Sequence, residues 1–599
     1  MTTSLIKFNL DMDKMNGNPT TIYTHEGYSK QEINDAMGFN YHGGFINFVN
    51  TNFINTSDGN AFLQWPEAYL NIPYSVTCEL KNKTGAELND FKFKTDDKYK
   101  YAISMKPFHH VIDRCDIKMG RAGNVVKQFN YTNLYINERL KTMNEDEYQV
   151  VGDLINYKLD NPETLEYAQS VGESNNDIHI GTFTRTTKDR TNYGFYERCL
   201  KNVEMIGDAN RDSALNNYKI PGNELKEAGF SGVGQITDTQ LVYNGTIILP
   251  LKYVHSFFDS LPTTKEMQGF EMKLFTNLDN NNVYTVSHSG ALAVTGVTCT
   301  QANAFTCPFM IGKVGLDGTA SSAFPVVNGT TANKRDTGFD LEFRTRIGWS
   351  TINGDKFVRD TASPACKIVI PMVKLNPTIA EQIVKVPMHV HRYRDIHIEI
   401  DSDINARSLG STVRRAINSN IGLARTLYII PFLSPSTTFT ATVNGNNVQI
   451  PLGVSPLLSP LSSAPTTCSP VLLKDFQVKI GSATLFQVNL MTNSDLYKDY
   501  LMSLYSHVNG NSLQSLDYGT RITFDKWVKG GYRVYAVDLK RILTKNADLS
   551  AKTIDIQFKI HGPETASIKY DFMYIIDSES QIFLDRISGV AKQTLDPEM

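Results

Sequence analysis

The chain has 599 residues, of which 41% are hydrophobic and 20% charged, and a formal net charge of −3 at pH 7. This composition excludes a disordered chain, and the lack of a basic tail argues against an electrostatic hold on nucleic acid. The length predicts roughly two to four domains. Seven scattered cysteines, none in a CxxC pair, argue against a disulfide framework and against a structural zinc knuckle.

Nothing in the sequence points to a membrane or to secretion. The longest apolar runs, such as TIILPL, are far shorter than the roughly 18 residues that a membrane-spanning helix needs. The first residues, MTTSLIKFNLDMDKM, lack the apolar segment of a secretory signal. We therefore expect a protein without a membrane span that is made and kept in a reducing, soluble compartment.

Strand patterns dominate the chain. In residues 68–80 the even positions are mostly apolar and the odd positions mostly polar, which is the pattern of a half-buried strand. Residues 553–562 alternate in the same way. Connectors rich in Asn, Gly, Ser and Thr separate such segments. A mostly β chain with long connections predicts sandwiches or barrels.

Few helices are expected. The best candidate is 144–160, which begins with Asn144 as N-cap and carries Glu147 three residues later. Shorter helices are predicted within 249–262 and within 494–508.

The stretch PMHVHRYRDIHIEID, residues 387–401, raises the question of a metal site. Read as a strand, it places isoleucines on one face and three histidines with three carboxylates on the other. His389, His391 and Glu399 could therefore act as ligands, as in metal-binding jelly-roll enzymes of the cupin type. A single strand cannot supply a convergent ligand set, however, and the alternative is a half-buried strand with a polar outer face.

Several strands are apolar on both faces. They are residues 366–373, 425–434 and 570–577. Because one face of a sandwich strand fills the core, the second face must be covered by a helix or loop of the same chain, or by contact between domains or subunits. The candidates for such covered faces or interfaces are Ile429, Leu433, Met573 and Ile575.

No catalytic constellation is found. The sequence has no P-loop, no GxSxG elbow and no HExxH motif. The pair His109–His110 could contribute at most one ligand to a cluster, because adjacent strand residues point in opposite directions. We therefore expect neither an enzyme nor a cofactor or bound metal.

Two β-rich blocks divide the chain. The segment KLNPTIAEQIVKVP, with two prolines, separates them and is the candidate boundary. Two polar stretches, 280–340 and 436–470, are candidates for long outer loops. The predicted divisions are an N-terminal arm 1–44, a first domain 45–377 with long insertions, a linker 378–385, a second domain 386–577 and a C-terminal tail 578–599.

Three segments in order resemble a known family. They are NGTIILPLKYVHSFFDSLPTTKEMQGFEMKLFTNLD, then ACKIVIPMVKLNPTIAEQIVK with YRDIHIEI and INSNIGLARTLYIIPFLSP, and then FQVKIGSATLFQVNLMTNSDLYKDYL with LDYGTRITFDKWVKGGYRVYAVDLKR. Their order and spacing over roughly residues 244–541 are similar to those of the double jelly-roll major capsid proteins of small DNA viruses, in the virophage and Polinton-like group.

This resemblance implies an all-β chain of two tandem eight-stranded jelly rolls with a few short helices and long loops. It implies a homotrimer that forms a pseudo-hexagonal capsomer in an icosahedral virion shell around DNA. The partners would be neighbouring capsomers, penton proteins and minor capsid or cement proteins, without sequence-specific binding of nucleic acid. The histidine-rich stretch would be the first strand of the second roll, with its isoleucines in the core and its polar face toward solvent or a neighbouring capsomer.

Two alternatives remain open from the residues alone. A bicupin-like jelly-roll metalloenzyme would use His389, His391 and Glu399, although no partner HxH cluster is found elsewhere. A viral spike or lectin-like β-sandwich that binds carbohydrate is the other.

Overall fold

The structure is a computed structural model. It describes residues 21–22, 30–34, 45–50, 61–82, 91–93, 103–119, 124–141, 143, 145–160, 198, 233–237, 239–261, 269–276, 278, 281–289, 293–301, 309–311, 326–328, 339–375, 385, 388–405, 412–417, 421, 424–434, 440–443, 446–449, 466–468, 471–509, 522–529, 531–539, 553–561, 569–585 and 591–594.

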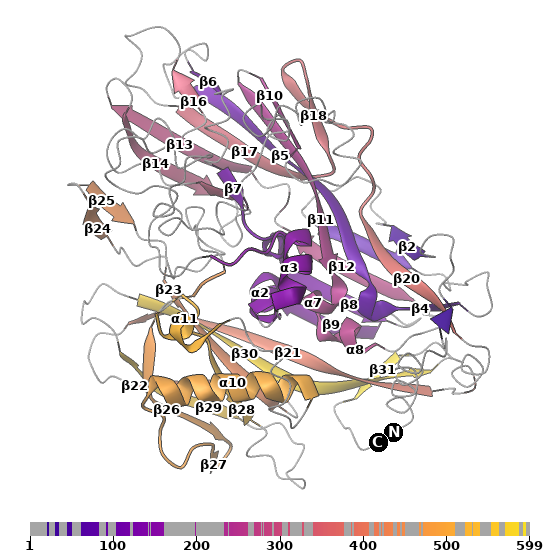
Figure 1. Ribbon diagram of the computed structural model, residues 1–599, viewed down its shortest axis with the longest axis vertical. Coiled ribbons are helices and arrows are strands. Elements are labelled where there is room, and N and C mark those ends of the chain that lie inside the picture. Colours follow the sequence, from indigo (N-terminus) through magenta and orange to yellow (C-terminus); the bar gives the residue numbers. More distant parts are fainter. Residues whose placement is uncertain are drawn as a thin grey trace.

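The C-terminal half folds as a jelly roll (Figure 1). One sheet has the order β21-β30-β23-β28 and the facing sheet the order β22-β29-β26-β27. In chain order the eight strands are β21 (Met388–Asn405), β22 (Thr412–Ile417), β23 (Ala424–Leu433), β26 (Leu472–Ile480), β27 (Ala483–Thr484), β28 (Tyr535–Asp538), β29 (Ile554–His561) and β30 (Lys569–Asp585). A short strand β31 (Ala591–Thr594) pairs with β30, and a hairpin of β24 (Thr440–Val443) and β25 (Asn446–Gln449) is inserted between β23 and β26.

The N-terminal half repeats this strand order. Its two sheets contain the paths β2-β20-β5-β11 and β3-β12-β8-β9. The eight strands are β2 (Lys30–Asn34), β3 (Phe45–Asn50), β5 (Tyr69–Asn82), β8 (Ile112–Met119), β9 (Asn124–Asn130), β11 (Gln240–Pro250), β12 (Phe270–Thr276) and β20 (Lys367–Leu375). The predicted all-β fold of two tandem jelly rolls is therefore confirmed.

Further strands extend the first roll. Because β5 is 14 residues long, its far end is free to pair with β17 (Phe339–Ile347), which continues the sheet through β13 (Asn281–Ser289) and β14 (Ala293–Gln301). The other additions are β1 (Thr21–Ile22), β4 (Ala61–Leu63), β6 (Phe91–Phe93), β7 (Ile103–Met105), β10 (Val233–Ile236), β15 (Phe309–Ile311), β16 (Val326–Asn328), β18 (Ser350–Asn353) and β19 (Lys356–Arg359). Much of this extension lies at the top of Figure 1. Part of the stretch 280–340, which we expected to be loop, is thus sheet.

The helices occur close to the predicted positions. The candidate at 144–160 is α3 (Glu145–Leu154), 249–262 contains α7 (Leu251–Val254) and α8 (Ser256–Ser260), and 494–508 lies in α10 (Asn493–Asn509). The other helical elements among the described residues are η1 (Trp65–Glu67), η4 (Phe108–Val111), α2 (Thr132–Lys141) and α11 (Phe524–Lys529). Figure 1 shows α2, α7 and α8 between the sheets of the two rolls.

The strand pairings move two of the predicted domain boundaries. β2, in the predicted arm 1–44, pairs with β20 over Lys30–Asn34 and is the first strand of the first roll. β30 continues into the predicted tail 578–599, because it pairs with the whole of β21, a strand of 18 residues. The first residue of β21, Met388, pairs with Asp585, the last residue of β30. Apart from residue 385, the predicted linker 378–385 lies outside the described residues, so the linker stays a prediction.

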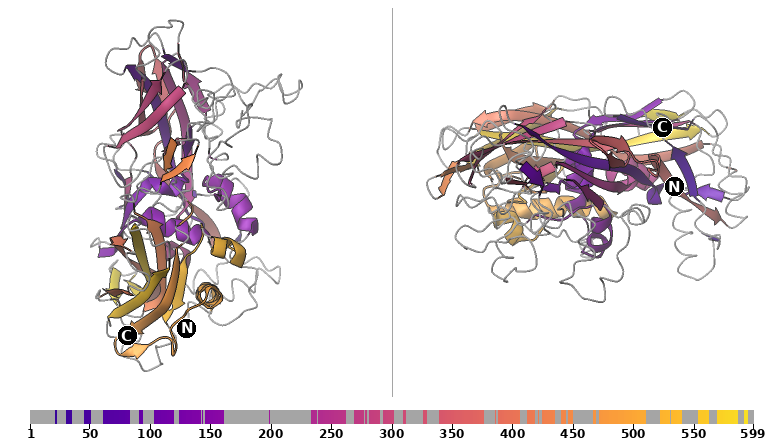
Figure 2. Two further views of the ribbon diagram at one scale, coloured as in Figure 1. Left: turned by 90° about the vertical axis from the view of Figure 1, so that its left-hand side faces the viewer. Right: turned by 90° about the horizontal axis from the view of Figure 1, so that it is seen from above.

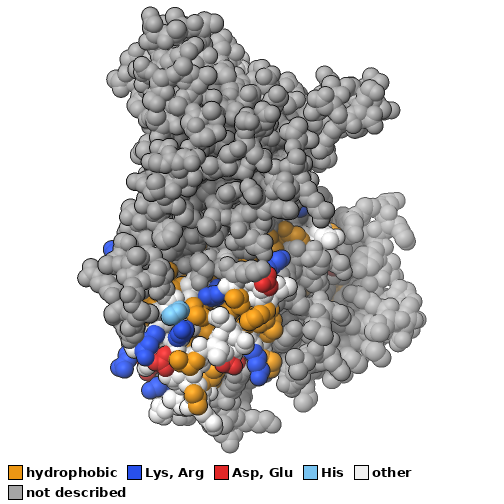
Figure 3. All heavy atoms as spheres, turned by 60° about the vertical axis from the view of Figure 1, so that its left-hand side comes forward, with side chains coloured by type: hydrophobic (Ala, Val, Ile, Leu, Met, Phe, Trp, Pro, Cys, Tyr) orange, Lys and Arg blue, Asp and Glu red, His pale blue; other side chains and the backbone are white. Residues whose placement is uncertain are grey.

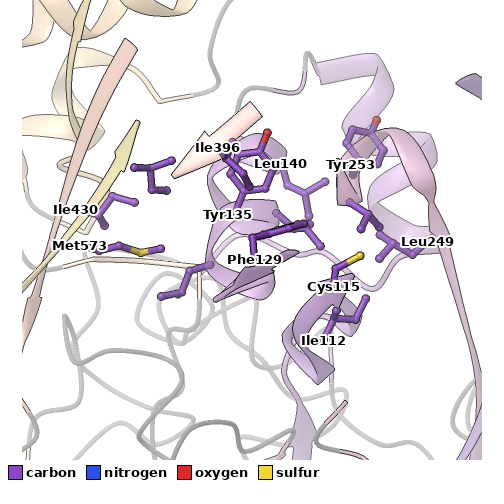
Figure 4. Close-up of a cluster of buried hydrophobic side chains, with 14 of the residues drawn as sticks. Ile112, Cys115, Phe129, Tyr135, Leu140, Leu249, Tyr253, Ile396, Ile430 and Met573 are labelled. Atoms are coloured by element: carbon purple, nitrogen blue, oxygen red, sulfur yellow. The ribbon is translucent and has the colours of Figure 1, made fainter. Parts of the chain in front are cut away.

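The two rolls share one hydrophobic core. Figure 4 shows a buried cluster in which side chains of both rolls meet, and Figure 2 shows the two rolls one above the other along the long axis. From the first roll come Ile112, Cys115, Phe129, Tyr135, Leu140, Leu249 and Tyr253, and from the second come Ile396, Ile430 and Met573. The rolls are therefore joined by burial of apolar surface as well as by the chain.

Candidate functional site

The four apolar residues predicted to be covered or at an interface do not share one face. In the register of β23 and β30, Ile429 pairs with Tyr574, whereas Met573 pairs with Ile430. The ring of Phe572 lies 5.0 Å from that of Phe558 on β29, so Phe572 and Tyr574 face the interior of the second roll. Ile429 therefore fills that interior, and Met573 and Ile575 face the opposite way.

The first roll covers this opposite face. Met573 and Ile575 are 0% and 1% exposed, and Figure 4 shows Met573 beside Ile430 and opposite Tyr135 of α2. Ile429 is also fully buried. Met573 and Ile575 therefore lie on a face that the first roll covers, whereas Ile429 is an ordinary core residue of the second roll. Leu433 pairs with Tyr570, but its side chain lies outside the described residues.

The histidine-rich strand is not the solvent-facing edge that we expected. His391 is 3% exposed, and its Nε2 lies 3.3 Å from the carbonyl oxygen of Phe257 in α8. Its ring packs edge-on against Phe257, 5.3 Å away. Burial lowers the pKa of His391 to about 4, and the hydrogen bond to the Phe257 carbonyl opposes this shift. The polar face is covered here because β21 crosses the helices of the first roll.

Farther along β21 the same face forms a charged network at the open edge of the second roll. The Nε2 atom of His397 lies 2.9 Å from Glu399, whose other oxygen accepts a hydrogen bond of 2.7 Å from Arg415 on β22. Asp401 lies 3.1 Å from the same guanidinium. Despite the opposing effect of burial, His397 and Arg415 lower the pKa of Glu399. These contacts tie the two sheets together across their edge.

This geometry does not favour the metalloenzyme alternative. His391 and Glu399 engage different partners, and the Arg415 guanidinium occupies the position near Glu399 where a cation would bind. The side chain of His389 lies outside the described residues. Within the described part of the chain, no group of three His, Cys, Asp or Glu side chains is placed to hold a metal ion. That the strand binds no stoichiometric metal stays a prediction.

No motif in the sequence points to the buried polar network that joins the two rolls. Asp160, which follows α3, and Arg198 form an ion pair of 2.8 Å in which both side chains are fully buried. The second carboxylate oxygen of Asp160 accepts hydrogen bonds from the backbone N–H and the hydroxyl of Thr466, at 3.0 and 2.6 Å. The hydroxyl of Tyr532 donates to the carbonyl of Asp160 at 2.6 Å. Their separations along the chain, such as 306 residues between Asp160 and Thr466, leave no local pattern to detect.

Large apolar side chains remain exposed on three helices. Val150 and Leu154 of α3 are 75% and 45% exposed, Met502 of α10 is 37% exposed, and Phe524 of α11 is 43% exposed. Figure 2 (left) shows the violet and gold helices of the two rolls along one side of the molecule. These residues, named here the helix face, are candidates for contact with another protein.

The coloured face of the second roll carries charges of both signs. Figure 3 shows hydrophobic side chains mixed with Lys, Arg and a few acidic residues on the part of the second roll that it colours. No helix among the described residues is long and apolar enough to cross a membrane.

In its fold, the chain is a double jelly-roll protein. It is similar to a chain of the Sputnik virophage in its 3.5 Å cryo-EM structure, with a TM-score of 0.50 and 10% identity over 97% of this chain and 91% of the other. It also matches the mavirus major capsid protein (TM-score 0.43, 13% identity, 96% and 92% of the two chains) and the Faustovirus major capsid protein (0.39, 10%, 93% and 90%). No protein-family model and no curated protein sequence matches the chain.

Proposed function

We propose that the chain is a major capsid protein, whose copies assemble into the shell of a DNA-containing virion. The observation that carries this proposal is the repetition of one strand order in two rolls that share a buried core. A subunit of this kind acts through its shape and contacts and not through catalysis. Its location would be the virion, and its partners would be other copies of itself with penton and cement proteins.

Three copies would form one capsomer. Each chain supplies two rolls of similar outline, so a ring of three chains presents six rolls and tiles a surface in a nearly hexagonal way. A ring of three uses heterologous contacts, in which one patch of a subunit meets a different patch of its neighbour. An obligate contact of this kind is expected to bury about 2,000 Å² or more.

Met573 and Ile575 are poor candidates for this contact, because the other roll already covers them. The helix face is the better candidate. It combines α3 of the first roll with α10 and α11 of the second, and Val150 and Phe524 leave much of their apolar surface in solvent. An aspartate at either position should weaken a contact without disturbing the interior of the chain.

Light scattering and negative-stain electron microscopy of the purified chain test the proposal. We expect a trimer near three times 67.1 kDa, with hexagonal outlines in projection. The Val150→Asp and Phe524→Asp variants should dissociate at micromolar concentration. Val358→Asp serves as the matched control, because Val358 is 37% exposed on the β18–β19 hairpin, away from the helix face.

The possible outcomes separate the parts of the proposal. A well-folded wild-type monomer would overturn the capsid assignment. A wild-type trimer with both aspartate variants still trimeric would leave the capsomer standing and remove the helix face as its contact. Slender spike-like trimers would instead favour the carbohydrate-binding alternative.

A further inference from the structure

Two histidines, one from each roll, hold the same residue. The backbone N–H of Phe257, in α8 of the first roll, donates to Nδ1 of His255 at 3.1 Å. The carbonyl of the same residue lies 3.3 Å from Nε2 of His391, in β21 of the second roll. His255 is completely buried and His391 is 3% exposed. We name this arrangement the histidine clamp.

The hydrogen bonds fix the protons of the clamp. Nδ1 of His255 must be unprotonated to accept from Phe257, so its single proton is on Nε2. His391 must carry its proton on Nε2 to donate to the carbonyl. A second proton on His255 could only go to Nδ1, where it would replace the acceptor that caps α8. A second proton on His391 would place a charge between aromatic rings.

The groups around the clamp favour its neutral form. Lys127 of β9 and Arg139 of α2 act on His255, and burial together with these two cations holds its pKa well below the ordinary value. The carboxylate of Asp395 on β21 lies 3.9 Å from Nε2 of His255 and favours a protonated His255. This carboxylate already pairs with Lys127 at 2.7 Å, however. The rings of Phe257 and Tyr393 surround His391, at 5.3 and 6.1 Å.

A second buried histidine pair lies in the first roll, where η4 contacts α2. His109 and His110 in η4 have ring centroids 4.4 Å apart and are 0% and 2% exposed. None of their four ring nitrogens has a partner at full hydrogen-bond geometry. The charged groups that act on the pair are Lys106, which precedes η4, together with Lys141 of α2 and Arg198.

The other groups beside this histidine pair are neutral or negatively charged. Asn137 of α2 approaches His109, and the ring of Tyr157, which follows α3, lies 5.7 Å from the His109 ring. Lys141 pairs with Glu138 at 2.5 Å, and Arg198 with Asp160 at 2.8 Å, so these two carboxylates are already engaged. Burial and the cations lower the pKa of His109 to about 3 and that of His110 well below its ordinary value.

We propose that the histidine clamp is an acid-sensitive latch between the two jelly rolls, which holds α8 against β21 while both imidazoles are neutral and releases it when they take up protons. The His109–His110 pair of η4 acts on stability in the same direction. The inference concerns the folded chain itself and stands whether or not the chain forms capsids.

The sign of the effect follows from the linkage between proton binding and folding. A histidine with a lowered folded pKa binds its proton only when the contact opens, so its contribution is intact above the unfolded pKa of about 6.5 and is lost as the pH falls. Between pH 7.5 and 5 each such histidine lowers the ratio of closed to open forms by up to about thirtyfold. Burial raises the pKa of Asp577 to about 6, against the effect of Arg394 and Arg139, so this carboxyl acts in the opposite direction.

Variants of the clamp isolate its contribution, because Asp577 and the second histidine pair are unchanged in them. His255→Asn keeps a side-chain acceptor for the N-cap of α8 without a titrating group, and His391→Gln keeps a donor for the Phe257 carbonyl. His561→Asn is the control, because His561 is exposed at the end of β29. Urea unfolding of the full chain at pH 7.5 and pH 5, at one protein concentration, compares the wild type, the two single variants, the double variant His255→Asn with His391→Gln, and the control.

Acidification lowers the ratio of folded to unfolded chains. We expect this ratio to fall by a factor up to about a thousand times larger in the wild type and the control than in the double variant. Parallel pH dependence of the wild type and the double variant would overturn the latch. If the double variant does not fold, hydrogen exchange of the wild type decides. Amides of α8 and β21 must then lose protection at pH 5, relative to those of β5 and after correction for the intrinsic rate, and unchanged relative protection would refute the proposal.

Discussion

Replacing Asp160 by Asn tests how strongly the buried polar network joins the two rolls. The carboxylate of Asp160 binds Arg198 through one oxygen and Thr466 through the other, and all of these bonds are buried. The substitution removes the negative charge and leaves the Arg198 guanidinium buried without an anionic partner. Breaking a buried pair in this way costs about 3–5 kcal/mol.

The expected loss follows from the groups that remain. Arg198 keeps its hydrogen bonds to the carbonyls of Met105 and Lys158, which solvate the charge in part and favour the lower end of that range. One end of an asparagine amide is an NH₂ group, which donates and cannot accept. It would face either Arg198 or the N–H and hydroxyl donors of Thr466, and one of these hydrogen bonds would be lost. We therefore expect Asp160→Asn to destabilise the chain by about 3 kcal/mol, roughly a 150-fold change in the folding equilibrium.

Urea unfolding monitored by tryptophan fluorescence measures this loss. Trp527 is a suitable reporter, because its indole N–H donates to the carbonyl of Val534 near the network. Tyr532→Phe is the milder control, since it removes one neutral hydrogen bond to the Asp160 carbonyl and should cost about 1 kcal/mol. The double variant Asp160→Asn with Arg198→Met should recover part of the loss, because no charge is left buried.

Two results would refute this reasoning. If Asp160→Asn costs less than about 1 kcal/mol, water must reach the guanidinium and the pair is not sealed between the rolls. If the double variant is less stable than Asp160→Asn alone, the loss comes from packing and not from an uncompensated charge.

Four further expectations follow from the same structure. Gly245→Ala should destabilise the chain by about 1–3 kcal/mol in thermal unfolding, because a Cβ there would lie 2.7 Å from the ring of Tyr74, and an unchanged unfolding temperature would contradict this. Met573→Asp should lower the free energy of unfolding by several kcal/mol, so that less folded chain is recovered, rather than release folded monomers. Light scattering that shows stable monomers would argue against the burial of Met573 between the rolls. Thiol labelling with peptide mapping should leave four buried cysteines unmodified until the chain unfolds, because burial makes their thiolates unfavourable. They are Cys78, Cys115, Cys366 and Cys468. Elemental analysis of dialysed protein should find no stoichiometric metal, and about one zinc, iron or manganese per chain, lost in a His391→Ala variant, would show that β21 is a metal site after all.

Local patterns in the sequence were sufficient for several strands and helices and for the mostly β class of fold. Alternation predicted β5 and β29, because a strand that separates core from solvent must place its side chains on two faces. A polar cap and helical spacing predicted α3. These features depend on neighbours within a few residues, so they can be read from one chain.

Only the tertiary structure decided what covers each face. The sequence identified Ile429 and Met573 as needing cover, but the pairing of β23 with β30 sends the first into the second roll and the second toward the first roll. The polar face of β21 looked suited to solvent or metal, yet the crossing over α8 buries His391 against Phe257. The network of Asp160 with Thr466 joins residues 306 positions apart. Burial and long-range pairing depend on which segments meet in space, and no local period in the sequence records that.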